Sequence, residues 1–227
     1  MTSFADTGGR RAPFEDERAP RAGSVPNHQR EPSAAAPVRG AIGTYFGRVR
    51  EFRRDDWPVY LGWVGLMLGL TGSTGGFLLL GHARGARFPA EAWMLPIGAA
   101  IFTLAIAVDT IGHRTVYKEV IARAEGLVHG LTIFCGIGSS VLLCAAYEAR
   151  DTFWIPAMVL TVMSFVYSLV DEAFHWHRYS TRASDPVEMW SHLFIFVGHG
   201  TMMLGWWRWF FLGYPGVDAT PKALLHA

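Results

Sequence analysis

The stretch Val170-Asp171-Glu172-Ala173-Phe174-His175-Trp176-His177 ends a long apolar run, and within it an acid is followed four residues later by a histidine. The same motif occurs three more times, as Asp109/His113, Glu125/His129 and Glu188/His192. On a helix, residues i and i+4 lie one above the other, so each pair presents a carboxylate and an imidazole in one direction. Random placement of nine histidines and 19 acids in 227 residues would give fewer than one such pair. The four pairs are therefore the main functional signal.

The pairs lie at the ends of apolar runs of about 20 residues, the length that crosses a hydrocarbon core about 30 Å thick. The sequence predicts an all-α membrane domain over residues 55–215, followed by a short C-terminal tail over 216–227. Its five predicted transmembrane helices are 58–80, 95–113, 127–147, 154–174 and 188–212. In the first of them Gly65, Gly69, Gly72 and Gly76 recur at helical spacing, which predicts close packing against a neighbouring helix. The tryptophans Trp206, Trp207 and Trp209 suit anchoring at a membrane interface.

Residues 1–54 differ from the rest of the chain. They are rich in Arg, Pro, Ala, Gly and Ser and show no apolar periodicity. Such a segment cannot bury enough apolar surface to offset its ordering entropy, so we expect a disordered tail. It also lacks the apolar core of a secretory signal peptide.

The distribution of basic residues predicts the orientation in the membrane. Cytoplasmic connections carry an excess of Lys and Arg. The basic residues on the more basic side are Arg48, Arg50, Arg53, Arg54, Arg114, Lys118, Arg123, Arg178 and Arg182. The other side has Arg84, Arg87 and Arg150, which nearby acids partly offset. We therefore predict a multi-pass protein of the cell inner membrane with a cytoplasmic N-terminus, and an odd number of spans places the C-terminus on the opposite side.

The last four predicted helices look like two copies of one helical hairpin. Residues 108–113 match 170–175 at an offset of 62, and residues 133–138 match 195–200 at the same offset. The pairs Glu125/His129 and Glu188/His192 match at an offset of 63, so the loop between them differs by one residue. Internal repeats are common in membrane proteins and bring equivalent residues together. A chance match between apolar helices is the alternative.

This topology places all four pairs at one membrane face, the cytoplasmic one by the charge bias, in a four-helix bundle. Ionisable groups at this depth are costly unless they are paired, solvated or bound to a metal. Imidazole and carboxylate together suit Fe, Mn or Zn, so we predict two non-haem metal ions, with iron favoured. The predicted ligands are His113, Glu125, His129, His175, Glu188 and His192. Additional ligands or supporting groups are Asp109, Asp171, Glu172, His177 and His199.

The array resembles the di-iron and di-manganese sites of helix bundles, which use inward-facing Glu and Glu-x-x-His ligands. In site chemistry alone it also resembles the membrane desaturases and hydroxylases whose histidines hold two irons, although the adjacent-histidine boxes of those enzymes are absent. The resemblance implies O₂-dependent hydroxylation or desaturation of an apolar or lipid substrate at the cytoplasmic face, with electrons from a donor protein. Pattern alone identifies no catalytic residue.

Three other interpretations stay open. His199 lies two turns beyond His192, and opposed histidines such as His129 and His192 could hold haem b in a cytochrome or a quinone-linked electron carrier. A second alternative is that the protein is a metal or proton transporter, or a structural membrane subunit. A single histidine near the end of a span is also common as an interfacial side chain, and an acid could bond only the histidine of its own pair. The sequence contains no nucleic-acid-binding motif.

Overall fold

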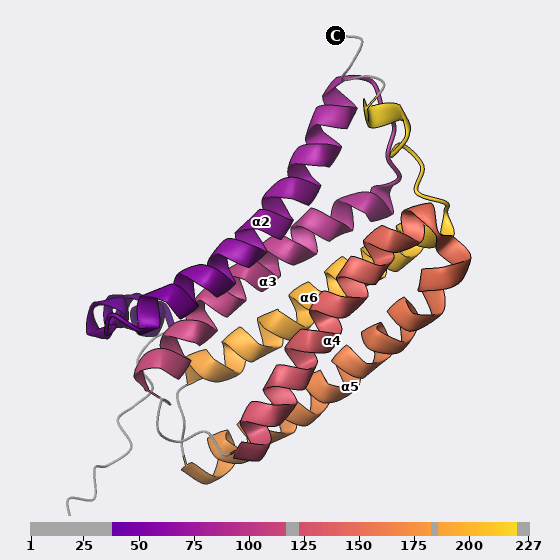
Figure 1. The fold of residues 1–227 in the computed structure, drawn as a ribbon. Helices are drawn as coiled ribbons and strands as arrows, with labels where there is room; N and C mark the ends of the chain where they lie inside the picture. Colours follow the sequence, from indigo (N-terminus) through magenta and orange to yellow (C-terminus); the bar gives the residue numbers. More distant parts are fainter. Residues whose placement is uncertain (1–37, 117–122, 183–185, 222–227) are drawn as a thin grey trace, which may run out of the picture. The chain divides into compact units, whose positions relative to one another are not determined.

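The computed structural model describes residues 38–116, 123–182 and 186–221, and all the regular elements in these ranges are helical. Figure 1 shows their order along the chain. The elements are α1 (Val38–Gly47), the 3₁₀ helix η1 (Arg48–Glu51), α2 (Asp56–Ala83), α3 (Ala90–Thr115), α4 (Arg123–Glu148), α5 (Arg150–Arg182) and α6 (Pro186–Phe211).

Four of these helices, α2, α3, α4 and α5, are long and apolar enough to cross a membrane. They indicate a membrane protein, in agreement with four of the five predicted spans. The fifth, α6, has 26 residues but is not among the four. Its sequence includes Glu188, His192, His199 and Arg208 together with four tryptophans, and these residues lower its mean hydropathy.

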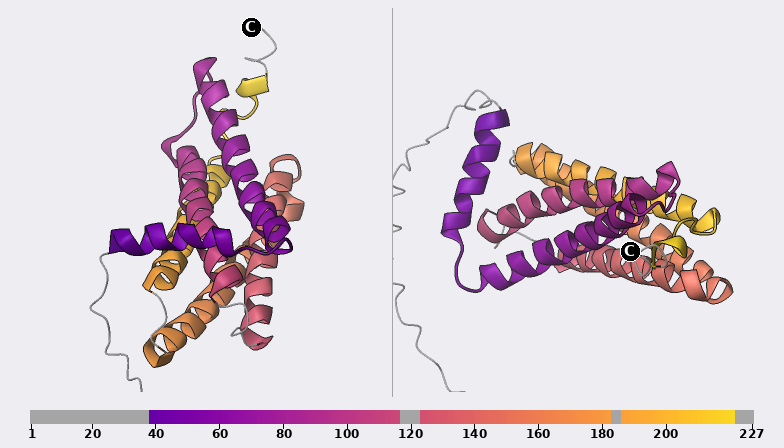
Figure 2. Two further views of the ribbon diagram at one scale, coloured as in Figure 1. Left: turned by 90° about the vertical axis from the view of Figure 1, so that its left-hand side faces the viewer. Right: turned by 90° about the horizontal axis from the view of Figure 1, so that it is seen from above.

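The long helices pack in pairs, and one of these pairs, α3 with α6, joins helices that are distant in sequence. Helix α3 packs along α6, α4 packs along α5, and α2 packs on the outer side of α3. Figures 1 and 2 show α4 and α5 beside the group formed by α2, α3 and α6. The contacts between the two groups run mainly through α5 and α6.

Helix α2 does pack closely, but its glycines do not make the contact. A Cβ added at Gly65, Gly69, Gly72 or Gly76 would meet no atom within 4 Å. The contact with α3 uses the adjacent face instead, where Thr71 Oγ1 and Thr103 Oγ1 lie 3.1 Å apart. The prediction of close packing through these four glycines is therefore wrong within the described chain.

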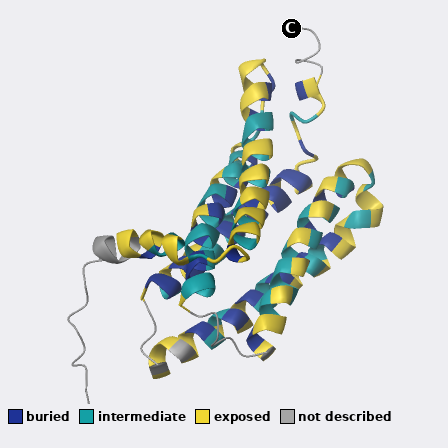
Figure 3. Ribbon diagram, turned by 60° about the vertical axis from the view of Figure 1, so that its left-hand side comes forward, coloured by how far each residue is buried: buried dark blue, intermediate teal, exposed yellow. Residues whose placement is uncertain are grey.

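The apolar core occupies the half of the bundle that contains the C-terminal end of α6. Trp206, Trp207 and Trp209 are buried there with Phe210 and Leu143. The indole N–H of Trp207 donates to Thr161 Oγ1 at 3.1 Å, so its one polar group is satisfied. These tryptophans belong to the protein core, although the sequence suggested interfacial anchors. Figure 3 shows the buried faces on α3 and α6 and the exposed outer faces of α2, α4 and α5.

The structure describes only part of each predicted tail. Residues 1–37 and 222–227 lie outside the described residues, so the predicted disorder of residues 1–37 is not tested. Residues 38–51, which were included in the disordered segment, form α1 and η1. The reason is a tertiary contact, because Tyr45 is buried against Ile111 and Val187. Helix α1 thereby crosses the ends of α3 and α6 (Figure 2).

Candidate metal centre

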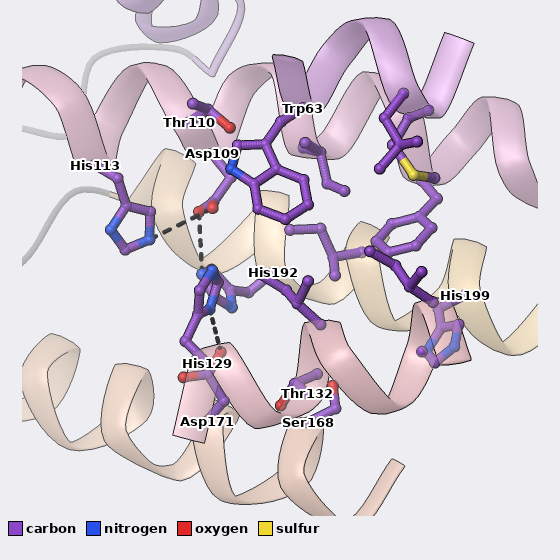
Figure 4. Close-up of a pocket in the computed structure, with 18 of the residues that line it drawn as sticks. Trp63, Asp109, Thr110, His113, His129, Thr132, Ser168, Asp171, His192 and His199 are labelled. Carbon is purple, nitrogen blue, oxygen red and sulfur yellow. Dashed lines mark hydrogen bonds and ion pairs between the residues drawn. The ribbon is translucent and has the colours of Figure 1, made fainter. Parts of the chain in front are cut away.

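All four acid–histidine pairs lie at one end of the helix bundle. Asp109 and His113 are in the last two turns of α3, and Asp171 and His175 are in the second half of α5. The other two pairs occupy the first turns of α4 and α6. We call this set the histidine layer. It comprises Asp109, His113, Glu125, His129, Asp171, His175, Glu188 and His192. Figure 4 labels Asp109, His113, His129, Asp171 and His192 of this layer, which lie around one space.

The imidazole rings form a continuous group. The ring centroids of His175 and His192 are 3.5 Å apart. His113 lies 6.1 Å from His175, 6.3 Å from His192 and 5.7 Å from His129. One nitrogen each of His113, His175 and His192 fall within 4.8 Å of one another, which makes this trio a candidate metal site. The side chain of His129 is 41% exposed and lies at the rim.

The two aspartates connect neighbouring helices. Asp109 Oδ1 on α3 lies 3.0 Å from His192 Nε2 on α6, and Asp171 Oδ2 on α5 lies 3.2 Å from His129 Nδ1 on α4. Within each i,i+4 pair the contacts are longer, at 3.4 Å for Asp109 to His113 and 3.8 Å for Asp171 to His175. The aspartates are therefore shared across helices and do not serve only the histidine of their own pair.

Two glutamates contact the Nδ1 atoms of the central histidines. Glu188 Oε1 lies 2.9 Å from His175 Nδ1, and Glu172 Oε1 lies 3.1 Å from His192 Nδ1. A carboxylate on one ring nitrogen fixes the tautomer and turns the other nitrogen toward a metal. Glu125 Oε1 faces the other nitrogen of His175, at 4.0 Å. Glu172 thus pairs with His192, although its sequence position also allowed it to share a helix face with His175.

Burial makes this arrangement costly without a bound group. His175 is only 1% exposed, and within the described chain its Nε2 makes no hydrogen bond, whereas Nε2 of the equally buried His192 has the contact with Asp109. A buried polar atom without a hydrogen bond lowers the stability of the fold by about 1–3 kcal/mol. With metal–nitrogen bonds of about 2.1 Å, two ligands of a tetrahedral ion lie about 3.4 Å apart. The three nitrogens, which lie within 4.8 Å of one another, would therefore have to move closer together by up to about 1.4 Å to bind one cation.

Two further predicted residues lie outside the layer. His177 is exposed, because a step of two positions from His175 turns its side chain to the opposite side of α5. His199 is buried deeper in the bundle, two turns along α6 from His192 (Figure 4). His177 therefore has no place in a metal site here, and His199 belongs to a different part of the pocket.

The layer closes one end of a largely apolar cavity of about 530 Å³. This volume is within the range of ligand pockets, about 300–1,000 Å³. All five long helices line the cavity, and its apolar wall includes Trp63, Leu66, Phe102, Ile106, Ile133 and Ile137. Sequence patterns did not reveal it, because each helix contributes only a few ordinary apolar side chains and no motif marks them.

Comparison of the chain with protein-family models, with curated proteins and with solved structures found no match. The fold and the site therefore define a class by their own features. That class is a helical membrane protein with a buried cluster of histidines and carboxylates at the end of an apolar cavity.

Proposed function

We propose that the histidine layer holds two iron ions and that the protein oxidises an apolar or lipid substrate with O₂, by hydroxylation or desaturation. The observation that carries this proposal is the position of the histidine layer at the end of an apolar cavity of about 530 Å³. A substrate in the cavity would lie directly against the imidazoles and carboxylates. An ion site without substrate access would not need such a cavity.

The charges of the layer support two metal ions. Asp109, Glu125, Asp171 and Glu188 are all at most 6% exposed. Four buried carboxylates are costly in a membrane, and their formal charge equals that of two divalent cations. Nitrogen and oxygen ligands of this kind suit iron or manganese, whereas thiolates would favour softer metals.

The contacts within the layer also support the hairpin duplication. The offsets in the sequence relate α3 to α5 and α4 to α6, so the α3–α6 pair corresponds to the α5–α4 pair. The contact of Asp109 with His192 then corresponds to the contact of Asp171 with His129, at 3.0 and 3.2 Å. Each half of the layer thus has an aspartate–imidazole contact, through Nε2 of His192 in one half and Nδ1 of His129 in the other, and one metal ion in each half would suit this repeat.

The side chains divide into ligands and positioning groups. His113, His129, His175 and His192 offer nitrogens, while Asp109, Asp171 and Glu125 offer oxygens toward the same space. Glu188 and Glu172 hold the rings of His175 and His192 through Nδ1. Glu188, a predicted ligand, therefore acts mainly by positioning His175.

The metal ions would supply O₂ activation. In a hydroxylation, one oxygen atom enters a C–H bond of the substrate and the other leaves as water, with electrons and protons supplied by an external reduced carrier protein. The apolar wall binds the hydrocarbon and keeps bulk water away, and the carboxylates of the layer accept and return protons.

Metal analysis and an optical spectrum of the detergent-purified protein test this proposal. We expect about two irons per chain and no Soret band. His192→Ala should lose most of the iron, whereas His177→Ala, a change to an exposed histidine on α5, should retain it. A Soret band would favour a haem protein, and equal iron in both variants would indicate adventitious binding.

A further inference from the structure

His199 has an unusual environment for an ionisable side chain. It is only 5% exposed, and its ring is stacked between Phe165 and Phe102, with centroid distances of 4.6 and 5.6 Å. The interplanar angles are 13° and 27°, so both phenyl rings stack on the imidazole. Only the ring edge is left to make polar contacts.

That edge faces the cavity. His199 lines the cavity wall, and its Nε2 is buried with no hydrogen-bond partner among the described residues. Gly136 on α4 lies opposite, where an added Cβ would be 3.9 Å from Nε2. Gly136 places no side chain against Nε2, and a polar atom of a ligand that reached Nε2 would satisfy the imidazole.

The cavity is accessible from the apolar surface of the bundle. Leu66 on α2 and Ile137 and Val141 on α4 line it and are 50%, 44% and 60% exposed. Both helices are long and apolar enough to cross a membrane, so this rim would face lipid. Molecules that reach the cavity by this route are lipid-soluble.

We infer that His199 binds the carbonyl or hydroxyl group of a lipid-soluble molecule whose apolar part extends along the cavity toward the histidine layer. His199 lies seven residues from His192, so this polar group would be held about 10 Å from the layer. The ligand would therefore present a carbon remote from its polar group to the layer. The identification of this ligand as the substrate rests on the proposed function, but its binding does not.

Binding of a long-chain methyl ketone, isotopically labelled at the carbonyl carbon, tests the inference by infrared spectroscopy in detergent. A hydrogen bond from His199 lowers the carbonyl stretching frequency of the bound ketone. We expect that His199→Phe, which keeps an aromatic ring between Phe102 and Phe165, abolishes this shift and weakens binding about tenfold. His177→Phe is the matched control and should change neither quantity. An unchanged shift in His199→Phe would overturn the inference.

Gly136→Leu provides a second variant that keeps the imidazole and fills the space beside it. It should also abolish the carbonyl shift, and full ketone binding in this variant would count against the inference.

A benzoquinone with the same alkyl chain, used in parallel, distinguishes a quinone ligand from an aliphatic one. Iron content, measured on the same samples, separates the two proposals. Binding that depends on His199 in a protein without iron would support the inference and contradict the proposed function.

Discussion

The glutamates of the histidine layer show how single residues acquire their roles. Glu188 is 2% exposed, and its Oε1 contacts Nδ1 of His175 at 2.9 Å, which orients the ring. Glu125 is similarly buried and faces Nε2 of the same histidine at 4.0 Å. The two acids therefore act on opposite edges of one imidazole. In the sequence the two glutamates cannot be told apart, because each precedes a histidine by four residues.

Replacement of either glutamate by glutamine tests the charge without a large change in shape. We expect Glu125→Gln and Glu188→Gln each to lower iron affinity about 10–100-fold, because groups that orient or complete a metal site have effects of this size. Glu148→Gln, at the exposed opposite end of α4, is the control and should bind iron normally. Iron titration of the purified variants measures the difference. Normal iron affinity in both buried variants would contradict a di-iron site and favour haem, which does not need carboxylates.

At the scale of helices, two glycines determine how closely α3 and α6 approach. A Cβ added at Gly98 would lie 2.7 Å from the carbonyl oxygen of Gly198 and would also collide with the backbone N of Met202. A Cβ added at Gly198 would lie 2.6 Å from the backbone N of Phe102. Backbone atoms cannot move aside as flexible side chains can. This close contact places Asp109 of α3 beside His192 of α6.

Gly98→Ala should therefore destabilise the bundle by about 1–3 kcal/mol, the usual cost of overpacking. The matched control is Gly69→Ala on α2, where an added Cβ meets nothing within 4 Å. That variant should be neutral or slightly stabilised, because alanine favours a helix more than glycine does. Thermal unfolding in detergent gives the melting temperatures of both variants. Equal melting temperatures would show that the α3–α6 contact is looser than the structure indicates.

For the whole molecule, the topology depends on whether α6 crosses the membrane. Helices α2 to α5 are four candidate spans, and α6 packs along α3, which itself is long and apolar enough to cross. A fifth crossing would place the two ends of the chain on opposite sides. The basic flank before α2 predicts that the N-terminus is cytoplasmic.

Reporter fusions at residues 1 and 227 test this topology. We expect a cytoplasmic signal at residue 1 and the opposite signal at residue 227. Reporters on the same side would show that the number of crossings is even and that α6 does not span the membrane. A reporter fused after residue 149, between α4 and α5, should agree with the one at residue 227 if five helices cross.

Much of the architecture could be predicted from local patterns. Runs of about 20 apolar residues predict helices wherever they occur, because a backbone in lipid must satisfy its own hydrogen bonds. The i,i+4 spacing of Asp109/His113 and its three counterparts also predicts which side chains share a helix face. Helix type, four of the candidate spans and the residues that meet in the histidine layer followed from these patterns.

Other features depend on contacts between distant segments. His192 contacts Asp109, which precedes it by 83 residues and lies on another helix, and no local rule selects this partner. The burial of Trp206 and Trp207, the docking of Tyr45 and the cavity in front of His199 are likewise results of packing among helices. Local sequence patterns are enough to predict the helices and their polar faces, because these depend on neighbours within one or two turns. The contacts between helices, the cavity and the burial of single side chains need the three-dimensional structure, because they depend on which helices pack together.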